Sequence, residues 1–462
     1  TEEVDVIVVG AGAAGIAAAR ELGAGGRRVI VLEGRGRVGG RAFTANVGDG
    51  VCPVDMGGQW LHQCGDENPV YHIAKAAGVR FVRPCEELPP DMADAHSRSR
   101  RWQVFDTVEG GPVSQEMLDD ASDAISRVVL QSAPELASED DGGDALWRRM
   151  LGFQCVVREQ VGTEALCVCA RVVDLKPQLE AADFADLSLQ LWDEGGELSG
   201  GDRSLPDGYG TLITSLATGL DVRFEHVVTD VVQDGEGVTV TATVGDAVHT
   251  FAAPYAVITL PVGVLKCDAV RFSPPLAATR RAAIARLGPG AANKLAVRFE
   301  KHWWPKSASA LGLLYDTVHD GYKEAAEDTP AFPWVFDNTL SCGQPVLLAF
   351  TNGRRAVAME ALTDEELVAL FVKDLRGVFG EGVVPAPVAH AVSRWASDPM
   401  SRGSWTSFPP GCGGVADMDA VAGFDGRLVF AGEHTFGAAQ GTVHGAFMSG
   451  QVAARGLLSP PA

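Results

Sequence analysis

The chain has 462 residues, 46% of them hydrophobic, and a formal net charge of −22 at pH 7. Its length suits roughly two to three globular domains, and no apolar run approaches the ~18 residues that a membrane-spanning helix requires. The acidic balance argues against nucleic acid or an anionic membrane as a partner, and it would raise the local concentration of a cationic substrate; an effect on solubility alone is the alternative.

The N-terminal segment contains a nucleotide-binding fingerprint. Four β-forming residues lead into a Gly-x-Gly-x-x-Gly turn made by Gly10, Gly12 and Gly15. The alanine-rich segment 13–22 that follows is predicted to be a helix. In this motif the first glycine permits the tight turn, the second lets a pyrophosphate approach the backbone, and the third lets the helix pack on the strand. The free N–H groups of the first helical turn, that of Ala14 among them, would bind the phosphates.

Glu33 supports the same prediction. It follows the second predicted strand, residues 29–32, and stands eighteen residues after Gly15. An acid at this place accepts hydrogen bonds from the ribose hydroxyls of a dinucleotide. Strand, turn, helix, strand and acid together predict a Rossmann-type α/β unit within residues 1–75.

The next part of the chain is less regular. Residues 81–144 are polar and helical in pattern but are interrupted by prolines, and 86–101 and 138–144 are predicted to be exposed loops. Further along, a β-meander is predicted over 227–252, and it leads into the apolar strand 255–260. A more helical region therefore separates two β-rich ones.

Strands and helices are both predicted in the C-terminal part. In chain order they are strands 295–299, 346–350 and 356–360, helix 364–379, strand 426–430 and helix 442–457. Thr363 is the expected N-cap of the long helix, and Glu366, three residues later, would complete a capping box with it.

Several further motifs follow in order along almost the whole chain. They are Gly-Arg-Gly-Arg-Val-Gly-Gly-Arg at 34–41, Asp-Met-Gly-Gly-Gln-Trp-Leu-His at 55–62, Leu-Pro-Val-Gly-Val-Leu at 260–265, Asn-Lys at 293–294, Phe-Ala-Gly-Glu-His at 430–434 and Gly-Thr-Val-His-Gly-Ala at 441–446. These motifs resemble those of the flavin-containing amine oxidases. Within that family the chain is most similar to polyamine oxidases and to the catalytic region of the lysine-specific histone demethylases. The resemblance implies that the dinucleotide is FAD.

The resemblance also implies a fold. It predicts a discontinuous, Rossmann-type (GR2-type) α/β FAD-binding domain, whose sheet the β-meander extends, formed by residues 1–75, 203–284 and 396–462. An α+β substrate-binding domain is inserted between these pieces and comprises residues 76–202 and 285–395. Monoamine oxidases place their flavin-linking cysteine where this chain has Ser404. FAD is therefore expected to be bound non-covalently.

The family match assigns flavin contacts residue by residue. Residues 34–41 would wrap the pyrophosphate and the flavin edge, and Glu433 would bind the ribityl chain. Thr442 begins the last helix, whose N–H groups and dipole would face the flavin pyrimidine, where negative charge accumulates on reduction. The full expected set is Gly10, Gly12, Ala14, Gly15, Glu33, Gly39, Gly40, Arg41, Gly57, Gly58, Gln59, Trp60, Val228, Gly432, Glu433, Gly441, Thr442 and Val443.

Two interpretations of Lys294 differ. Strand alternation places its side chain with Ala296 and Arg298, opposite Leu295 and Val297, on a face that would normally meet solvent. The resemblance instead implies a catalytic lysine that holds a water against flavin N5 and favours the anionic reduced flavin. Alternation alone therefore predicts a surface lysine, and the motif predicts an active-site one.

Three more residues are assigned to catalysis by the resemblance. Trp405 would form one aromatic wall beside the substrate nitrogen. The second wall of monoamine oxidases falls at Thr442, which is not aromatic. His62 matches a histidine at the active-site edge of polyamine oxidases, where it would accept the substrate proton or bind a distal amine. A purely structural histidine is the alternative.

Acidic residues are candidates for binding a cationic substrate. Between residues 180 and 202 the chain has seven acids and no Lys or Arg, and most of them are expected to form a solvated face. Asp193 matches an acid on the substrate side of the demethylases. Asp193 and Glu67 are the two candidates selected for substrate binding.

The predicted function is that of a FAD-dependent amine oxidase acting on a polyamine or another primary or secondary amine. Hydride transfer to flavin N5 would give an imine, and reoxidation by dioxygen would release hydrogen peroxide. One alternative is a tailoring oxidase of specialised metabolism, whose imine or iminium is trapped within the substrate. The other is an L-amino-acid oxidase, which commonly has an arginine where this chain has Gln59 and Trp60.

The remaining expectations concern metals, compartment and assembly. Of the nine cysteines only Cys167 and Cys169 form a close pair, and they lack partner ligands for zinc, so no metal is expected. Scattered cysteines and the lack of a signal segment predict a cytoplasmic protein with reduced thiols. A homodimer is left open.

Overall fold

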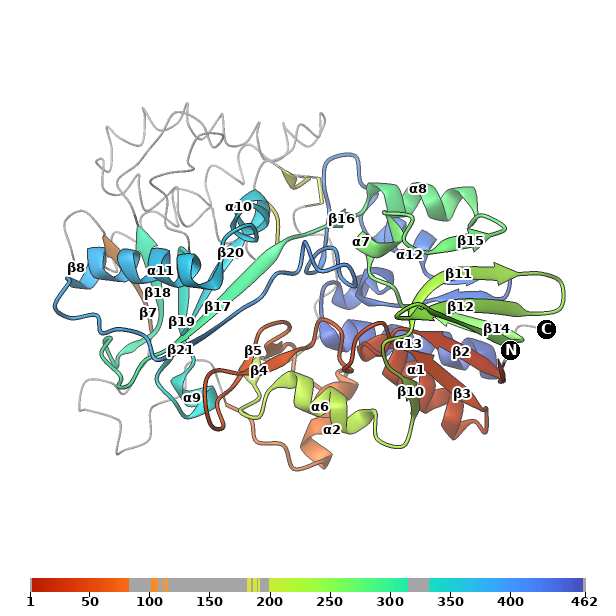
Figure 1. Cartoon of the computed structure of the whole chain (residues 1–462), viewed down its shortest axis with the longest axis horizontal. Helices are drawn as coiled ribbons and strands as arrows, with labels where there is room; N and C mark the ends of the chain where they lie inside the picture. Colours follow the sequence, from red (N-terminus) through yellow and green to blue (C-terminus); the bar gives the residue numbers. More distant parts are fainter. Residues whose placement is uncertain are drawn as a thin grey trace.

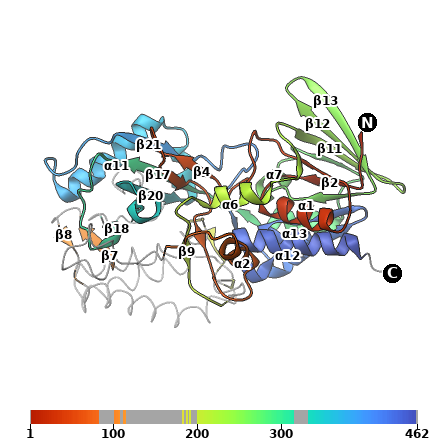
Figure 2. The same cartoon turned by 90° about the horizontal axis from the view of Figure 1, so that it is seen from below.

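The computed structural model describes residues 2–82, 101–106, 111–112, 114, 181–183, 186–188, 190–191, 199–314 and 332–459. The molecule has two lobes (Figure 1), seen from below in Figure 2. One lobe contains a six-stranded sheet with its helices, and the other contains a seven-stranded sheet covered by one long helix.

The six-stranded sheet is the nucleotide-binding sheet that the fingerprint predicted. Its strand order is β10 (Asp221–Arg223), β3 (Val29–Leu32), β2 (Val6–Val9), β14 (Tyr255–Ile258), β24 (Leu428–Phe430) and β23 (Gly423–Asp425). The first five strands pair in parallel, and β23 is antiparallel at the edge. Segments hundreds of residues apart thus form one sheet, which is why its domain must be discontinuous.

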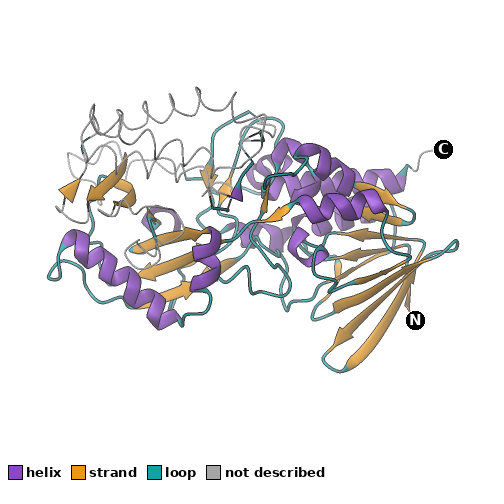
Figure 3. Ribbon diagram, turned by 90° about the horizontal axis from the view of Figure 1, so that it is seen from above, coloured by secondary structure: helices purple, strands orange, loops and turns teal. Residues whose placement is uncertain are grey.

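Both faces of this sheet are buried, as expected for parallel strands. Successive side chains of a strand point to opposite faces, so neighbouring residues join different cores. One face packs on helices α1 (Ala13–Ala24) and α13 (Val443–Leu458), on the helical side of the lobe in Figure 3, through Val6, Val8, Val31 and Val257. The opposite face packs on the β-meander through Ile7, Val9, Ile30, Leu32, Ala256 and Ile258.

The β-meander forms a sheet of its own, so the expectation that it extends the nucleotide-binding sheet is wrong. The order of this five-stranded sheet is β1 (Glu2–Glu3), β13 (Ala247–Ala253), β12 (Val238–Val244), β11 (Val227–Gln233) and β15 (Arg271–Ser273). Val231, Val240 and Phe251 belong to the core that also contains Ile7 and Ile30 of the six-stranded sheet. The alternation of Val with Thr in β12 therefore indicates a sheet with one buried face, and this face packs on the six-stranded sheet.

The second lobe is built on a seven-stranded sheet. Its order is β21 (Ala389–Val392), β17 (Ala292–Arg298), β20 (Val346–Asn352), β19 (Trp334–Asp337), β18 (Ala308–Leu314), β7 (Arg101–Asp106) and β8 (Gly111–Pro112). Helix α11 (Asp364–Phe379) covers one face through Leu367, Phe371 and Leu375. The other face packs on Val54 and Met56, at the hairpin of β4 (Thr44–Asn46) and β5 (Pro53–Asp55) from the first lobe.

Short elements connect and cover these sheets. They are strands β6 (Trp60–Leu61), β9 (Arg203–Ser204), β16 (Gly288–Pro289) and β22 (Thr406–Ser407), and helices α2 (Pro69–Ala76), α6 (Tyr209–Leu216), α7 (Val262–Leu265), α8 (Ala278–Arg286), α9 (Thr339–Cys342), α10 (Gly353–Met359) and α12 (Val415–Val421). Single 3₁₀ turns occupy Glu433–Thr435 and Gly437–Ala439. Among the described residues no helix is long and apolar enough to cross a membrane.

The predicted elements compare with the structure as follows. The capping box of α11 is confirmed, because the Thr363 side chain accepts from Glu366 N–H and the Glu366 side chain accepts from Thr363 N–H. Residues 356–360 are not a strand, because α10 covers all but the last of them. The loop 138–144 and all of 86–101 except Arg101, which begins β7, lie outside the described residues. The division into two domains stays a prediction.

Candidate active site

One large cavity joins the two lobes. Its volume is about 1270 Å³, and its lining includes the fingerprint turn, the β14–α7 loop, the start of α13 and side chains of the seven-stranded sheet. Pockets for small ligands usually measure about 300–1,000 Å³. The cavity is therefore large enough for a dinucleotide together with a small substrate.

The fingerprint turn forms the nucleotide end of the cavity. A Cβ on Gly15 would lie 1.9 Å from the Gly10 carbonyl oxygen, so only glycine lets α1 approach the turn this closely. Gly12 precedes α1 and has open space where a Cβ would point, which leaves room for a pyrophosphate above the helix N-terminus. The buried Glu33 carboxylate accepts N–H groups of Ala11 at 2.7 Å and Arg35 at 2.9 Å.

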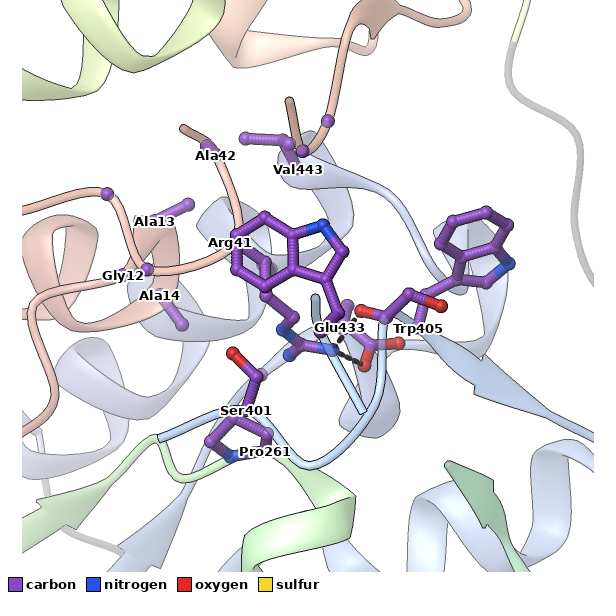
Figure 4. Close-up of a pocket in the computed structure, with 18 of the residues that line it drawn as sticks. Gly12, Ala13, Ala14, Arg41, Ala42, Pro261, Ser401, Trp405, Glu433 and Val443 are labelled. Carbon is purple, nitrogen blue, oxygen red and sulfur yellow. Dashed lines mark hydrogen bonds and ion pairs between the residues drawn. The ribbon is translucent and has the colours of Figure 1, made fainter. Parts of the chain in front are cut away.

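An ion pair lies next to this turn. Arg41 donates to Glu433 at 2.9 Å and to the Ser404 carbonyl at 2.7 Å. In Figure 4 this pair lies between Gly12 at the start of α1 and Trp405. Burial alone would raise the pKa of Glu433, but the charge of Arg41 helps to outweigh burial, and the pKa is lowered. The carboxylate is therefore ionised and fixed inside the cavity wall.

Lys294 is buried in the wall between the lobes, with 6% of its surface exposed. Its Nζ donates to the carbonyl oxygens of Asp55 at 3.0 Å and Gly57 at 2.7 Å and to Gln59 Oε1 at 3.0 Å. Burial lowers its pKa below the ordinary lysine value, and the Asp55 carboxylate partly opposes that change. The surface position that alternation alone predicted is wrong, because the hairpin of the other lobe covers this face of β17.

A cluster of three aromatic rings contacts the same lysine through Trp60 and Phe350. Trp60 stacks on Phe350 with centroids 5.8 Å apart, and Phe336 contacts both rings edge-on. Lys294 Nζ lies 4.7 Å from the centre of Phe350. Strand register explains the grouping, because Phe350 pairs with Lys294 across β17 and β20. The sequence motifs gave no indication of Phe336 or Phe350.

Trp405 and the start of α13 line the cavity, as do Pro261 and Val264. A Cβ on Gly441, whose φ is +69°, would lie 3.0 Å from Trp405 Cδ1, so this glycine lets the indole lie against the turn. Thr442 is the N-cap of α13 and accepts the Gly445 N–H at 3.0 Å. Thr442 thus caps the helix and lines the cavity at once.

His62 forms a polar corner with three neighbours. Its Nδ1 lies 3.0 Å from Asp202 Oδ2. The next residue, Gln63, bonds through Oε1 to the Nε2 of His444 at 3.0 Å. Burial, with the charge of His62, lowers the pKa of His444 to about 4, so its imidazole is neutral at pH 7. Sequence reasoning noted Asp202 within the acidic run but did not select it.

The other expected site residues fall in several places. The cavity lining includes His62, Trp60, Val228, Gly432, Val443 and most of the other expected flavin contacts, whereas Gly15 lies behind the turn. Glu67 is exposed and is not among the described residues that line the cavity. Asp193 lies outside the described residues. Asp202, from the same acidic run, does line the cavity.

The residues present fit a flavin dinucleotide. The turn leaves space where side chains would block a pyrophosphate, and Glu33 and Glu433 both line the same cavity, each held by hydrogen bonds. In the described part of the chain no cluster of three His, Cys, Asp or Glu side chains could hold a metal ion. No cysteine occurs among the described lining residues.

Comparison with known proteins identifies the family. The model of the family described as flavin containing amine oxidoreductase matches residues 13–458. The chain belongs to this family. It is 33% identical to polyamine oxidase 4 of Oryza sativa subsp. japonica, over 97% of this chain and 87% of the relative. It is 32% identical to polyamine oxidase 2 of Arabidopsis thaliana, over 98% of this chain and 88% of the relative.

Two further similarities complete the comparison. Lysine-specific histone demethylase 1 homolog 2 of Oryza sativa subsp. japonica is 32% identical over 96% of this chain, which spans only 56% of that relative. A solved structure of a putrescine oxidase double mutant, from a redesign of cofactor binding, shares the fold with a TM-score of 0.72 at 20% identity over 99% of both chains. The predicted α/β fold, the FAD cofactor and the amine oxidase class are confirmed.

Proposed function

We propose that the protein oxidises a polyamine or a related primary or secondary amine to an imine, with dioxygen as the electron acceptor and hydrogen peroxide as the second product. The observation that favours this reaction is the buried lysine beside three aromatic rings in the wall of the cavity. Relatives named as polyamine oxidases match nearly the full length of the chain, which supports a polyamine-like substrate.

The fingerprint turn and its surroundings are proposed to hold the cofactor. The N–H groups at the start of α1 and the Arg41 side chain would bind the pyrophosphate, and the remaining lone pairs of Glu33 would accept ribose hydroxyls. The start of α13, capped by Thr442, would direct its N–H groups at the flavin pyrimidine. The absence of cysteine from the described lining supports non-covalent FAD.

Bound FAD supplies the acceptor for a hydride from the carbon next to nitrogen. That carbon can release a hydride readily only when the amine is neutral, because an ammonium has no lone pair. Trp60, Phe336 and Phe350 would keep this part of the cavity apolar and thereby favour the neutral amine. Trp405 would contact the substrate opposite these rings, and His62 would receive the substrate proton. Lys294 would contribute a positive charge at the reaction centre, because its three donors are already bonded to Asp55, Gly57 and Gln59.

The test is an anaerobic mixing experiment. The yellow holoenzyme is mixed with spermine, spermidine, acetylated polyamines, benzylamine, tryptamine and amino acids, and flavin bleaching is followed with time. We expect rapid bleaching by at least one polyamine and peroxide formation on admission of air. Bleaching by amino acids alone would contradict the proposal and favour an L-amino-acid oxidase. No bleaching by any member, with FAD bound, would contradict it in favour of a tailoring oxidase with a dedicated substrate.

A further inference from the structure

Asp202 and His62 are brought together by a short antiparallel ladder. Strands β6 and β9 pair Trp60 with Ser204 and Leu61 with Arg203, so the next pair along the ladder is His62 with Asp202. Cys64 N–H bonds to the Gly201 carbonyl and continues the same pairing. The side chains meet at 3.0 Å, between residues separated by 140 positions in the sequence. The main chain thus fixes this pair at the cavity wall.

The Asp202 carboxylate is held but remains accessible. One oxygen faces His62 Nδ1, and the other accepts the N–H of Gln63 at 3.3 Å. Gln63 has φ +54°, a left-handed conformation that aims this N–H at the carboxylate. The Asp202 side chain is 44% exposed and lines the cavity, so each oxygen keeps a lone pair for a ligand.

Among the described residues, no lysine or arginine forms an ion pair with this carboxylate. In the described part of the chain, His62 is its only ion-pair partner, and Arg203 directs its guanidinium to the Asp202 backbone carbonyl at 2.7 Å. Burial alone would raise the pKa of Asp202, but the bond and charge of His62 help to lower it overall. Asp202 is therefore an ionised acid with spare hydrogen-bonding capacity inside an active-site cavity.

Trp60 connects this corner to the proposed reaction centre. Its ring centroid lies 6.0 Å from that of His62 and 5.8 Å from Lys294 Nζ. An extended molecule lying along Trp60 would therefore have one end near the lysine and the other near Asp202. Polyamines have this form, because their ammonium groups are separated by short apolar linkers.

From this arrangement we infer that Asp202, paired with His62 beside Trp60, is a specificity-determining residue that binds a second ammonium group of the substrate. The inference rests on the proposed function and names the substrate class more closely as an amine with two or more positive charges. A carboxylate can pair with one charge of such an amine while the other nitrogen reacts. A monoamine of equal length leaves Asp202 without that partner.

The test compares two amines of equal length, 1,4-diaminobutane and butylamine. Their dissociation constants are measured by calorimetry on the holoenzyme with its flavin reduced beforehand under anaerobic conditions, so that no turnover occurs. We expect wild type to bind the diamine at least about tenfold more tightly, and Asp202→Asn to lose most of this preference with little change for butylamine. Asp207→Asn, exposed on the same segment, is the matched control.

A second variant separates anchoring from a structural role. Asp202→Glu keeps the charge and is expected to retain the diamine preference within about threefold. Equal weakening of both amines in Asp202→Asn would overturn the inference and leave Asp202 as a residue that only positions His62. Lack of a diamine preference in wild type would also overturn it. A lack of flavin reduction by every amine would instead contradict the proposed function, because the binding preference is measured without turnover.

Discussion

At the scale of single residues, Lys294 has an unusual environment for a lysine. All three of its hydrogen-bond donors have oxygen acceptors, and the ammonium also lies over an aromatic ring. Burial opposes its charge, whereas these acceptors and the Asp55 carboxylate favour it. A charge balanced in this way inside an active-site cavity is typical of a functional group.

Replacement of Lys294 is the first expected test of that role. Lys294→Met should retain FAD but slow either flavin reduction or flavin reoxidation by at least about tenfold, because a preorganised charge at the site is lost. The measurement is stopped-flow spectroscopy of the two half-reactions. Lys301→Met, an exposed lysine just beyond β17, is the control and should leave both rates unchanged. Unaltered half-reactions in Lys294→Met would refute the assigned role.

His444 makes a pH-dependent contribution to stability. Its folded pKa is about 4, below the ordinary value of 6.5, so between these values only the unfolded state takes up the proton. The contribution of this group to the free energy of unfolding is therefore complete above pH 6.5. This contribution decreases as the pH falls, by about 2 kcal/mol between pH 7 and pH 5. Denaturant unfolding at both pH values should show a smaller loss for His444→Gln than for wild type. His249→Gln, an exposed histidine, should match the wild-type loss.

Residues whose role depends on local spacing could be predicted, whereas residues brought in by distant pairing could not. Gly10, Gly12 and Glu33 follow from one strand–turn–helix unit. Asp202 meets His62 only through the β6–β9 ladder, and Phe350 meets Lys294 only through β17 and β20. No periodicity in a single strand contains that information.

At the scale of elements, α1 offers a matched pair of glycines. A Cβ on Gly15 would lie 1.9 Å from the Gly10 carbonyl, whereas a Cβ on Gly23 would meet no atom within 4 Å. Gly15→Ala should cost about 1–3 kcal/mol and weaken FAD retention, because α1 must move away from the turn. Gly23→Ala should be neutral or stabilising by at most about 1 kcal/mol. Thermal unfolding and the FAD content after gel filtration check both, and equal behaviour of the two variants would count against this packing argument.

The elements themselves were predictable to different degrees. A capping box predicts the start of helix α11, and this signal is contained within four residues. The predicted strand 356–360 is helical in α10 because residues 356–359 are a short apolar run, which periodicity alone cannot assign, and alanine favours helices. The sequence could not predict which sheet packs on the β-meander. Alternation of apolar and polar residues shows that one face is buried, but it does not show which sheet covers that face.

At the scale of the whole molecule, one cavity depends on the assembly of both lobes. The fingerprint, the β14–α7 loop, α13 and the seven-stranded sheet all contribute to its lining, although they are widely separated in the sequence. The second lobe supplies Lys294, Phe336 and Phe350, and the first supplies the oxygen acceptors that hold the lysine. Separation of the lobes would therefore break the three hydrogen bonds that hold Lys294, which favours a fixed arrangement of the two lobes.

The net charge of −22 gives a prediction for the whole molecule under the proposed function. A long-range negative field accelerates the encounter with cationic substrates, and salt screens it because the Debye length falls from about 30 Å at 0.01 M to about 3 Å at 1 M ionic strength. The kcat/KM for spermidine should therefore fall several-fold between about 0.01 M and 0.5 M NaCl, and that for butylamine should fall less, since it has a single charge. Steady-state assays at fixed pH measure both. An equal fall for the two amines would mean that salt acts on the enzyme itself and that the surface charge serves solubility alone.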